Sequence, residues 1–425
     1  MKVVVNIQRK IVDLAYKYKS VILRIFPKTV LKEMKSKLIR SNIKQLSKVS
    51  FIPFEREVFP DGINLIGSIK AETGLGQSCR LLANEIMHTK LPFTIYDYES
   101  LGEMSLKDNS FDEYISNECK YNVNLVHINP RELGIALVKL DQGIWDKRYN
   151  IGFWLWELEE FPEEWIPFIN YFNEIWTPSE FISRSIRKCT EKPVITIPYS
   201  IESSIDKAWG RQQFKLPEDQ FLFLMMFDYN SVAERKNPLG MIEAFKRAFS
   251  PEKSNVGLVI KVTSANESDI NELRSKLSDY KNVYFITSVL EKQRVNSLIN
   301  CVDVVVSLHR AEGFGLVMAE AMSLGTPTIA TNWSSNTEFM NSDVACMVDY
   351  KMIELSRDLG PFKKGQRWAD ADIEQAADYM KRLVVDKKYY DEIKTNAQKH
   401  VNKVLGMEHI KTLIEQRVEE IYYKR

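Results

Sequence analysis

From residue 61 onward, short apolar runs alternate with segments whose apolar positions recur at helical spacing. Apolar runs that end in turn residues are typical of strands buried in a parallel sheet. In the first half we expect a helix over residues 78–87 and strands over residues 62–68, 93–96, 123–128, 149–155, 174–177 and 194–197. This βαβ rhythm predicts a parallel sheet with helices on both faces.

The pattern lapses between residues 197 and 218, where turn and polar residues predominate, and we expect the hinge there. It resumes with a helix over 238–249 and strands over 221–227, 256–262, 283–285, 302–307 and 328–330, and the last 50 residues predict helix only. The sequence therefore predicts an α/β protein with two Rossmann-like, doubly wound domains facing a central cleft. Ligands of such folds bind at the carboxyl ends of the strands.

A length of 425 residues suits two domains with separate cores. We place the N-terminal Rossmann-like domain at 56–205 and the C-terminal one at 206–405. Residues 1–55 form an extension, and residues 406–425 form a helix expected to pack back on the N-terminal domain.

The extension is strongly basic, because residues 1–50 carry 13 Lys or Arg and 2 Asp or Glu, whereas the rest of the chain has a net charge of −10. Residues 8–48 repeat apolar positions at helical spacing, which predicts an amphipathic helix interrupted at Pro27. Two interpretations remain open: a helix packed on the body with solvated lysines, or a peripheral anchor on an anionic membrane surface. The acidic body argues against nucleic-acid binding.

The five cysteines are scattered and include no Cys-x-x-Cys pair. This usage suits a reducing compartment and argues against a disulfide framework or a structural zinc site. The sequence has no run of 18 apolar residues and no secretory signal pattern at its start. We therefore expect a cytoplasmic protein, peripheral on the inner face of the cell membrane if the extension binds lipid.

The most informative segment begins after the predicted strand 302–307, where Gly313 and the residues after it open a helix. A glycine turn at a helix N-terminus presents free N–H groups and a positive dipole end, which suit a diphosphate. Glu312 precedes this turn and Glu320 follows eight positions later. Glu320 would reach a ribose, and Glu312 would face sugar hydroxyls. A plain strand–loop–helix crossover is the alternative, but two glutamates at this spacing favour a phosphorylated sugar carrier.

Glu312 and Glu320 resemble the Glu-x7-Glu signature of family 4 retaining glycosyltransferases (glycosyl transferases group 1), which have the GT-B fold. Residues 227–238 resemble the family's phosphate-binding strand–loop–helix, and residues 197–202 resemble its hinge. Residues 335–338 resemble its Gly-Gly-x-x-Glu segment, with Ser335 and Asn336 in place of the glycines. The resemblance spans most of residues 60–420.

The resemblance implies transfer of a sugar from a UDP- or GDP-sugar, with retention, to a glycan or lipid-linked glycan acceptor in surface polysaccharide biosynthesis. It implies no metal and no cofactor besides this co-substrate. Domain 56–205 would be the acceptor side and domain 206–405 the donor side. The implied catalytic residues are Glu312, Lys236 and His127. The implied donor-binding residues are Arg235, Gly313, Phe314, Gly315, Leu316, Glu320, Gly74 and Gly76. The family has an arginine five or six residues before this lysine, where this chain has Ser231 and Asn230, and Arg235 is the available substitute.

Several alternatives stay open. A tryptophan-rich segment over 153–165, followed by Trp176, suits either an acceptor wall or the core, and we favour the core. A GT-B phosphorylase or a catalytically silent sugar-nucleotide-binding protein would share the fold. A Rossmann dehydrogenase is disfavoured, because Gly74 and Gly76 lack the third glycine of its fingerprint.

Overall fold

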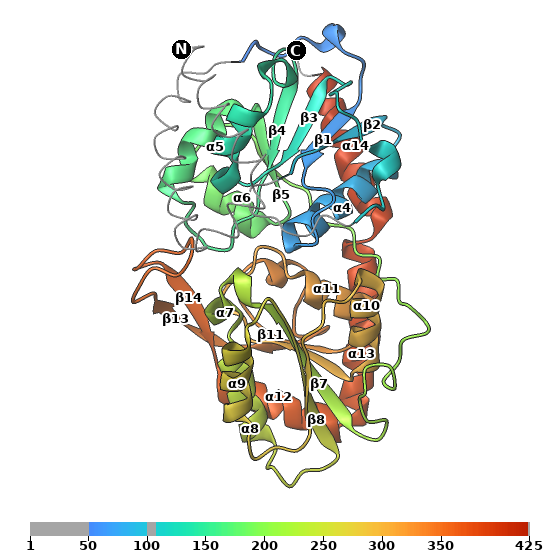
Figure 1. Ribbon diagram of the computed structural model, residues 1–425, viewed down its shortest axis with the longest axis vertical. Helices are drawn as coiled ribbons and strands as arrows, with labels where there is room; N and C mark the ends of the chain where they lie inside the picture. The colour runs from blue at the N-terminus through green and yellow to red at the C-terminus, as the bar shows by residue number, and fades with distance from the viewer. Residues whose placement is uncertain (1–50, 100–107, 424–425) are drawn as a thin grey trace.

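The computed structural model describes residues 51–99 and 108–423. Its N-terminal half is built on a six-stranded parallel sheet with strand order β2-β1-β3-β4-β5-β6 (Figure 1). The strands are β1 (Ile63–Gly67), β2 (Phe93–Asp97), β3 (Val123–His127), β4 (Tyr149–Phe153), β5 (Glu174–Thr177) and β6 (Val194–Thr196). All six predicted strands of this half are present.

Three buried asparagines fix the register of the central strands. Asn64 of β1 lies opposite Asn124 of β3, which in turn lies opposite Asn150 of β4. The Nδ2 of Asn64 donates to the Oδ1 of Asn124 at 2.9 Å, and the Nδ2 of Asn124 donates to the Oδ1 of Asn150 at 2.8 Å. A shift of one residue would leave these buried amides without partners, so the ladder specifies the pairing.

Helices cover both faces of this sheet: α4 (Gly74–Met87) packs with one face, and α5 (Pro130–Lys139) and α6 (Glu180–Arg187) pack with the other. The prediction that α4 begins near residue 78 is wrong, because Thr73 caps it by accepting from the N–H of Gly76 at 3.2 Å. Gly74 and Gly76 therefore lie in the first helical turn and not in a loop. A Cβ on Gly76 would come within 2.0 Å of the carbonyl oxygen of Ala71, so glycine permits a close backbone approach.

Residues 197–220 contain no helix or strand and connect the halves. The C-terminal half has a second six-stranded parallel sheet, of order β12-β11-β10-β7-β8-β9, and a separate hairpin, β13-β14. The strands are β7 (Phe221–Asp228), β8 (Val256–Thr263), β9 (Val283–Ile286), β10 (Val304–Ser307), β11 (Thr328–Thr331), β12 (Cys346–Val348), β13 (Tyr350–Glu354) and β14 (Arg367–Ala371). The sequence did not predict the last three.

The α-helices after residue 220 are α7 (Ala233–Lys236), α8 (Pro238–Ala248), α9 (Glu267–Lys276), α10 (Lys292–Cys301), α11 (Leu316–Ser323), α12 (Ile373–Val385), α13 (Lys387–Val404) and α14 (Met407–Tyr423). The chain crosses back at its end, so α14 lies beside α4 against the N-terminal half (Figure 1). There the guanidinium of Arg417 pairs with the buried carboxylate of Glu174, and the Tyr422 hydroxyl accepts from the N–H of Gly62 at 3.0 Å.

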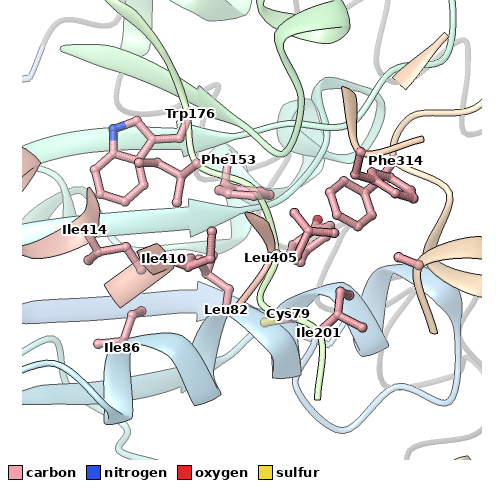
Figure 2. Close-up of a cluster of buried hydrophobic side chains, with 14 of the residues drawn as sticks. Cys79, Leu82, Ile86, Phe153, Trp176, Ile201, Phe314, Leu405, Ile410 and Ile414 are labelled. Atoms are coloured by element: carbon pink, nitrogen blue, oxygen red, sulfur yellow. The ribbon is translucent and has the colours of Figure 1, made fainter. Parts of the chain in front are cut away.

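One apolar cluster joins both halves. Figure 2 shows Cys79, Leu82 and Ile86 of α4 opposite residues of the sheet, with Phe314 of the C-terminal half in the same cluster. The tryptophan-rich segment is core, as we favoured: Trp154, Trp156, Trp165 and Trp176 are at most 7% exposed. The hairpin adds to this core, because Phe362 lies against Trp156 with ring centroids 5.5 Å apart.

Among residues 51–99 and 108–423, no helix combines the length and apolarity that crossing a membrane requires. The predicted basic extension lies almost entirely outside the described residues.

Candidate active site

The candidate site begins where β10 ends and the chain turns into α11. Gly315 caps α11 in the left-handed region, at φ +98°, a conformation that glycine adopts without strain. A Cβ on Gly313 would lie 3.1 Å from the carbonyl oxygen of Trp156, so the turn also approaches the N-terminal half closely. Phe314 between them is 5% exposed.

Glu312 is held from both its backbone and its side chain. Its N–H donates to the Oγ of Ser334 at 3.0 Å, and its carbonyl accepts from the Oγ of Ser335 at 2.9 Å. Its carboxylate pairs with the Nζ of Lys236 and lies 3.5 Å from Nη1 of Arg235. Burial raises the pKa of this carboxyl, but the two cations outweigh that effect and lower its pKa to about 2. Glu312 is therefore a fixed negative charge at physiological pH.

Arg235 and Lys236 end the one-turn helix α7, which begins after Val232 in the left-handed region, at φ 64°. Arg235 is buried. Its side chain is 5% exposed and its Nη1 donates to the carbonyl oxygen of Ala311 at 2.7 Å. Lys236 is more open, at 23%, and burial lowers its pKa despite the opposing effect of Glu312. Arg235 thus braces the loop, while Lys236 is the cation that a ligand can reach.

Glu320 lies in the middle of α11 and is 4% exposed. Its carboxylate pairs with the Nζ of Lys292, the first residue of α10. Glu312 and Glu320 thus flank the start of α11 at Leu316 in the chain, and each pairs with a different lysine.

His127 lies at the carboxyl end of β3 in the N-terminal half. Its Nε2 is 2.6 Å from the Oγ of Ser78 on α4, and its ring stacks on Phe153 with centroids 5.4 Å apart. Burial lowers its pKa to about 4, so the ring is neutral at physiological pH. Ser78 follows Gly74 and Gly76 on α4, and of these three residues Ser78 is the one that contacts His127.

The structure adds residues that sequence reasoning missed. His309 is fully buried, with Nε2 at 3.0 Å from the Oδ1 of Asn336, and burial lowers its pKa. Ser334 adopts φ 72° and supports Glu312. Ser179 reaches across from the N-terminal half, where its Oγ donates to the carbonyl oxygen of Gly313 at 3.1 Å. Only Ser179 carried a local signal, as a helix N-cap.

Glu338 forms a second contact between the halves. Its carboxylate accepts from the N–H groups of Glu180 and Phe181 at 2.8 and 2.7 Å, at the first turn of α6. The segment Ser335–Glu338, a short 3-10 helix, therefore supports Glu312 at one end and caps a helix of the other half at its other end.

The structure thus brings Arg235, Lys236, Glu312 and the glycine turn into one group. His127 belongs to the other half and is connected to Phe314 of the turn through the packed rings of Phe153 and Tyr199. Glu320 belongs to a separate ion pair. Within the described parts of the chain, no three His, Cys, Asp or Glu side chains are grouped so that they could hold a metal ion.

Residues 207–400 match the family model described as Glycosyl transferases group 1. Similar solved structures include HepE of Anabaena in complex with UDP and glucose, at 12% identity and a TM-score of 0.59, with 85% of this chain and 100% of that chain covered. Another is sucrose-phosphate synthase from Thermosynechococcus elongatus, at 14% identity and a TM-score of 0.61, with 85% and 99% covered. A third is the pneumococcal O-GlcNAc transferase GtfA in complex with UDP and GlcNAc, at 15% identity and a TM-score of 0.52, with 71% and 57% covered. These likenesses confirm the predicted GT-B fold. No curated protein matches the chain.

Proposed function

We propose that this protein is a retaining, metal-independent glycosyltransferase that takes its sugar from a nucleotide diphospho-sugar. One observation carries the proposal: a partly open lysine, Lys236, pairs with the buried Glu312 at the turn that leads into α11. A cation and a helix N-terminus that converge on one turn suit a diphosphate. The group 1 match over residues 207–400 supports the same assignment.

The proposed roles combine what the family resemblance implies with the exposure and partners of these side chains. Lys236 and the N–H groups of Gly313, Phe314, Gly315 and Leu316 bind the diphosphate. Glu320 binds the ribose, and Glu312 binds sugar hydroxyls and keeps Lys236 in place. Arg235, which is buried against Ala311, stabilises the loop and adds positive charge on the buried side of the site. Gly74, Gly76 and His127 form the opposite wall, with His127 next to the transferred sugar.

In the reaction, an acceptor hydroxyl oxygen bonds to the anomeric carbon as the bond from that carbon to the diphosphate oxygen breaks. The diphosphate leaves with the electron pair, and its oxygen takes the acceptor proton, so no separate general base is needed. Lys236 and the helix N-terminus stabilise the charge that develops on the leaving group. Glu312 stays ionised and paired, which suits a binding role rather than that of a glycosidase acid.

UDP-sugars are the first donors to test, because HepE and GtfA were solved with UDP and a sugar. The protein is incubated with UDP-, GDP- and ADP-sugars, and nucleotide release is measured beside the thermal shift that each nucleotide causes. We expect release from at least one donor, a large loss with Lys236→Ala, and no loss with Lys246→Ala, an exposed lysine on α8. Binding without release would indicate a silent sugar-nucleotide-binding protein, and sugar phosphate formed from inorganic phosphate would indicate a phosphorylase. Absence of any binding would overturn the proposal.

We further propose a glycan or lipid-linked glycan acceptor in surface polysaccharide synthesis, with the enzyme peripheral on the cytoplasmic membrane face. The net charge of +11 over residues 1–50 motivates this placement. Sedimentation with anionic liposomes should fall when residues 1–50 are deleted and also when salt is raised. Undiminished binding of the shortened chain would contradict the membrane role.

A further inference from the structure

The start of the linker, at Tyr199, Ser200 and Ile201, is attached to α4 and to the end of α13. The hydroxyl of Tyr199 forms a short hydrogen bond with the Oγ of Ser78. The N–H of Ser200 donates to Glu85 of α4 at 2.6 Å, and the N–H of Ile201 donates to the carbonyl oxygen of Leu405 at 2.8 Å. Tyr199 is 0% exposed, so its hydroxyl depends on protein partners.

Ser78 connects this linker tyrosine to the candidate catalytic histidine. Its Oγ contacts the Tyr199 hydroxyl on one side and the Nε2 of His127 on the other, at 2.6 Å. The hydrogens of the row set its direction, because if Nε2 of His127 donated to Ser78, one of the two hydroxyl hydrogens would have no acceptor among the described residues. Nε2 is then the acceptor, so Ser78 donates to His127 and Tyr199 donates to Ser78. The three groups satisfy one another in a buried row.

The other side of Tyr199 touches the donor half. Its ring packs edge-on against Phe314, with centroids 5.0 Å apart, and Phe314 lies between the two glycines of the turn. The same ring also contacts Phe153, at 5.8 Å, on which His127 stacks. Tyr199 is thus in contact with the donor turn and is one residue away from His127.

We propose that Tyr199 and Ser78 are positioning residues for the transfer reaction: they fix the ring orientation and the Nδ1–H tautomer of His127. This inference rests on the proposed function, in which His127 borders the transferred sugar. Because Tyr199 is held against Phe314, the hydrogen-bonded row is complete only while the donor turn is packed on the linker. The row therefore links the geometry of one half to a reactive group of the other.

Tyr199→Phe is the decisive variant, because it keeps the ring packing and removes only the hydroxyl. We expect kcat to fall about tenfold, the rate equivalent of one hydrogen bond, with the donor KM nearly unchanged. Ser78→Ala should cause a similar loss. The matched control is Tyr171→Phe, which removes another buried hydroxyl of the N-terminal half, one with no hydrogen-bond partner among the described residues.

A second readout does not depend on activity. The chain has five histidines, so the ring-nitrogen NMR signals of His127 can be assigned by comparison with His127→Gln. We expect one tautomer, protonated at Nδ1, in the wild type and in Tyr171→Phe, and a mixture in Tyr199→Phe and Ser78→Ala. An unchanged tautomer in Tyr199→Phe, or a kcat equal to that of Tyr171→Phe, would overturn the inference. If no sugar donor is used at all, the proposed function fails, and the NMR result still decides whether the row holds His127.

Discussion

Glu312 in the C-terminal half and Glu85 in the N-terminal half are both buried glutamates that hold a connecting segment, but their surroundings differ. Glu312 has two cations beside it, which lower its pKa to about 2 although burial raises it. Among residues 51–99 and 108–423, Glu85 accepts only from the backbone and hydroxyl of Ser200, and burial raises its pKa to about 8. One half therefore keeps a buried charge where a substrate would bind, and the other keeps a neutral acid where it only holds the linker.

The largest expected effect comes from replacing Glu312, the buried glutamate that stays ionised. Glu312→Ala should lower kcat about 100-fold, because Lys236 loses its anchor and the sugar loses a hydrogen-bond acceptor. Steady-state nucleotide release measures the effect. Glu312→Gln keeps the shape and removes the charge, so it should retain more activity than Glu312→Ala. Equal activity of Glu312→Ala and the wild type would remove this residue from the site.

The second prediction concerns Glu85, the glutamate that burial keeps protonated, and uses the pH dependence of stability. Its folded pKa lies above its unfolded value of 4.5, so its contribution to stability is full below about pH 4.5 and is lost as pH rises toward 8. The amide of Glu85→Gln does not ionise, so this variant does not lose stability in this way as pH rises. The stability of this variant relative to the wild type should therefore rise by about 2 kcal/mol between pH 5 and pH 7. Chemical unfolding at several pH values measures it, and a difference that stays constant with pH would show that Glu85 ionises normally.

Glu320→Ala should separate donor binding from turnover within the donor half. Because Glu320 is assigned to the ribose, we expect the donor KM to rise about tenfold with kcat changed less, the reverse of the pattern for Glu312→Ala. The control is Glu272→Ala, an exposed glutamate on α9. The same kinetic signature for Glu312→Ala and Glu320→Ala would contradict the division of roles.

The smallest expected effect concerns the cap between the halves. Glu338→Gln keeps an acceptor for the N–H groups of Glu180 and Phe181 but loses the charge, whereas Glu338→Ala loses the cap. We expect Glu338→Ala to lower stability by about 1 kcal/mol, and Glu338→Gln by less. Thermal unfolding measures both. If the two variants were equally destabilised, charge rather than capping would hold α6.

Much of the fold was predictable, because buried parallel strands produce apolar runs that can be recognised locally. The strands β12, β13 and β14 were not, because β12 has three residues and the hairpin depends on pairing and on Phe362 meeting Trp156. The start of α4 was misplaced because two glycines in a first turn look like a loop, and only the Thr73 cap reveals the helix.

For the candidate site, the glutamates and Lys236 were visible as motifs, although Lys236 and Glu312 are 76 positions apart. The supporting residues were not visible. Ser179 meets Gly313 across 134 positions and His309 is recognisable only from its burial, so both depend on how the halves pack. Sequence patterns therefore predict local secondary structure and motifs well, but they do not predict which side chains meet between the two halves.

The return of α14 means that the order of residues in the chain does not match the division of the molecule into halves. The N-terminal half is completed by its last helix, through Arg417 on Glu174 and Tyr422 on Gly62. A fragment ending in the linker would leave the apolar face of α4 uncovered, while a protein cut in the linker would stay assembled through α14. Each half is thus a discontinuous piece of chain, and the N-terminal sheet reaches its final packing only when α14 has been made.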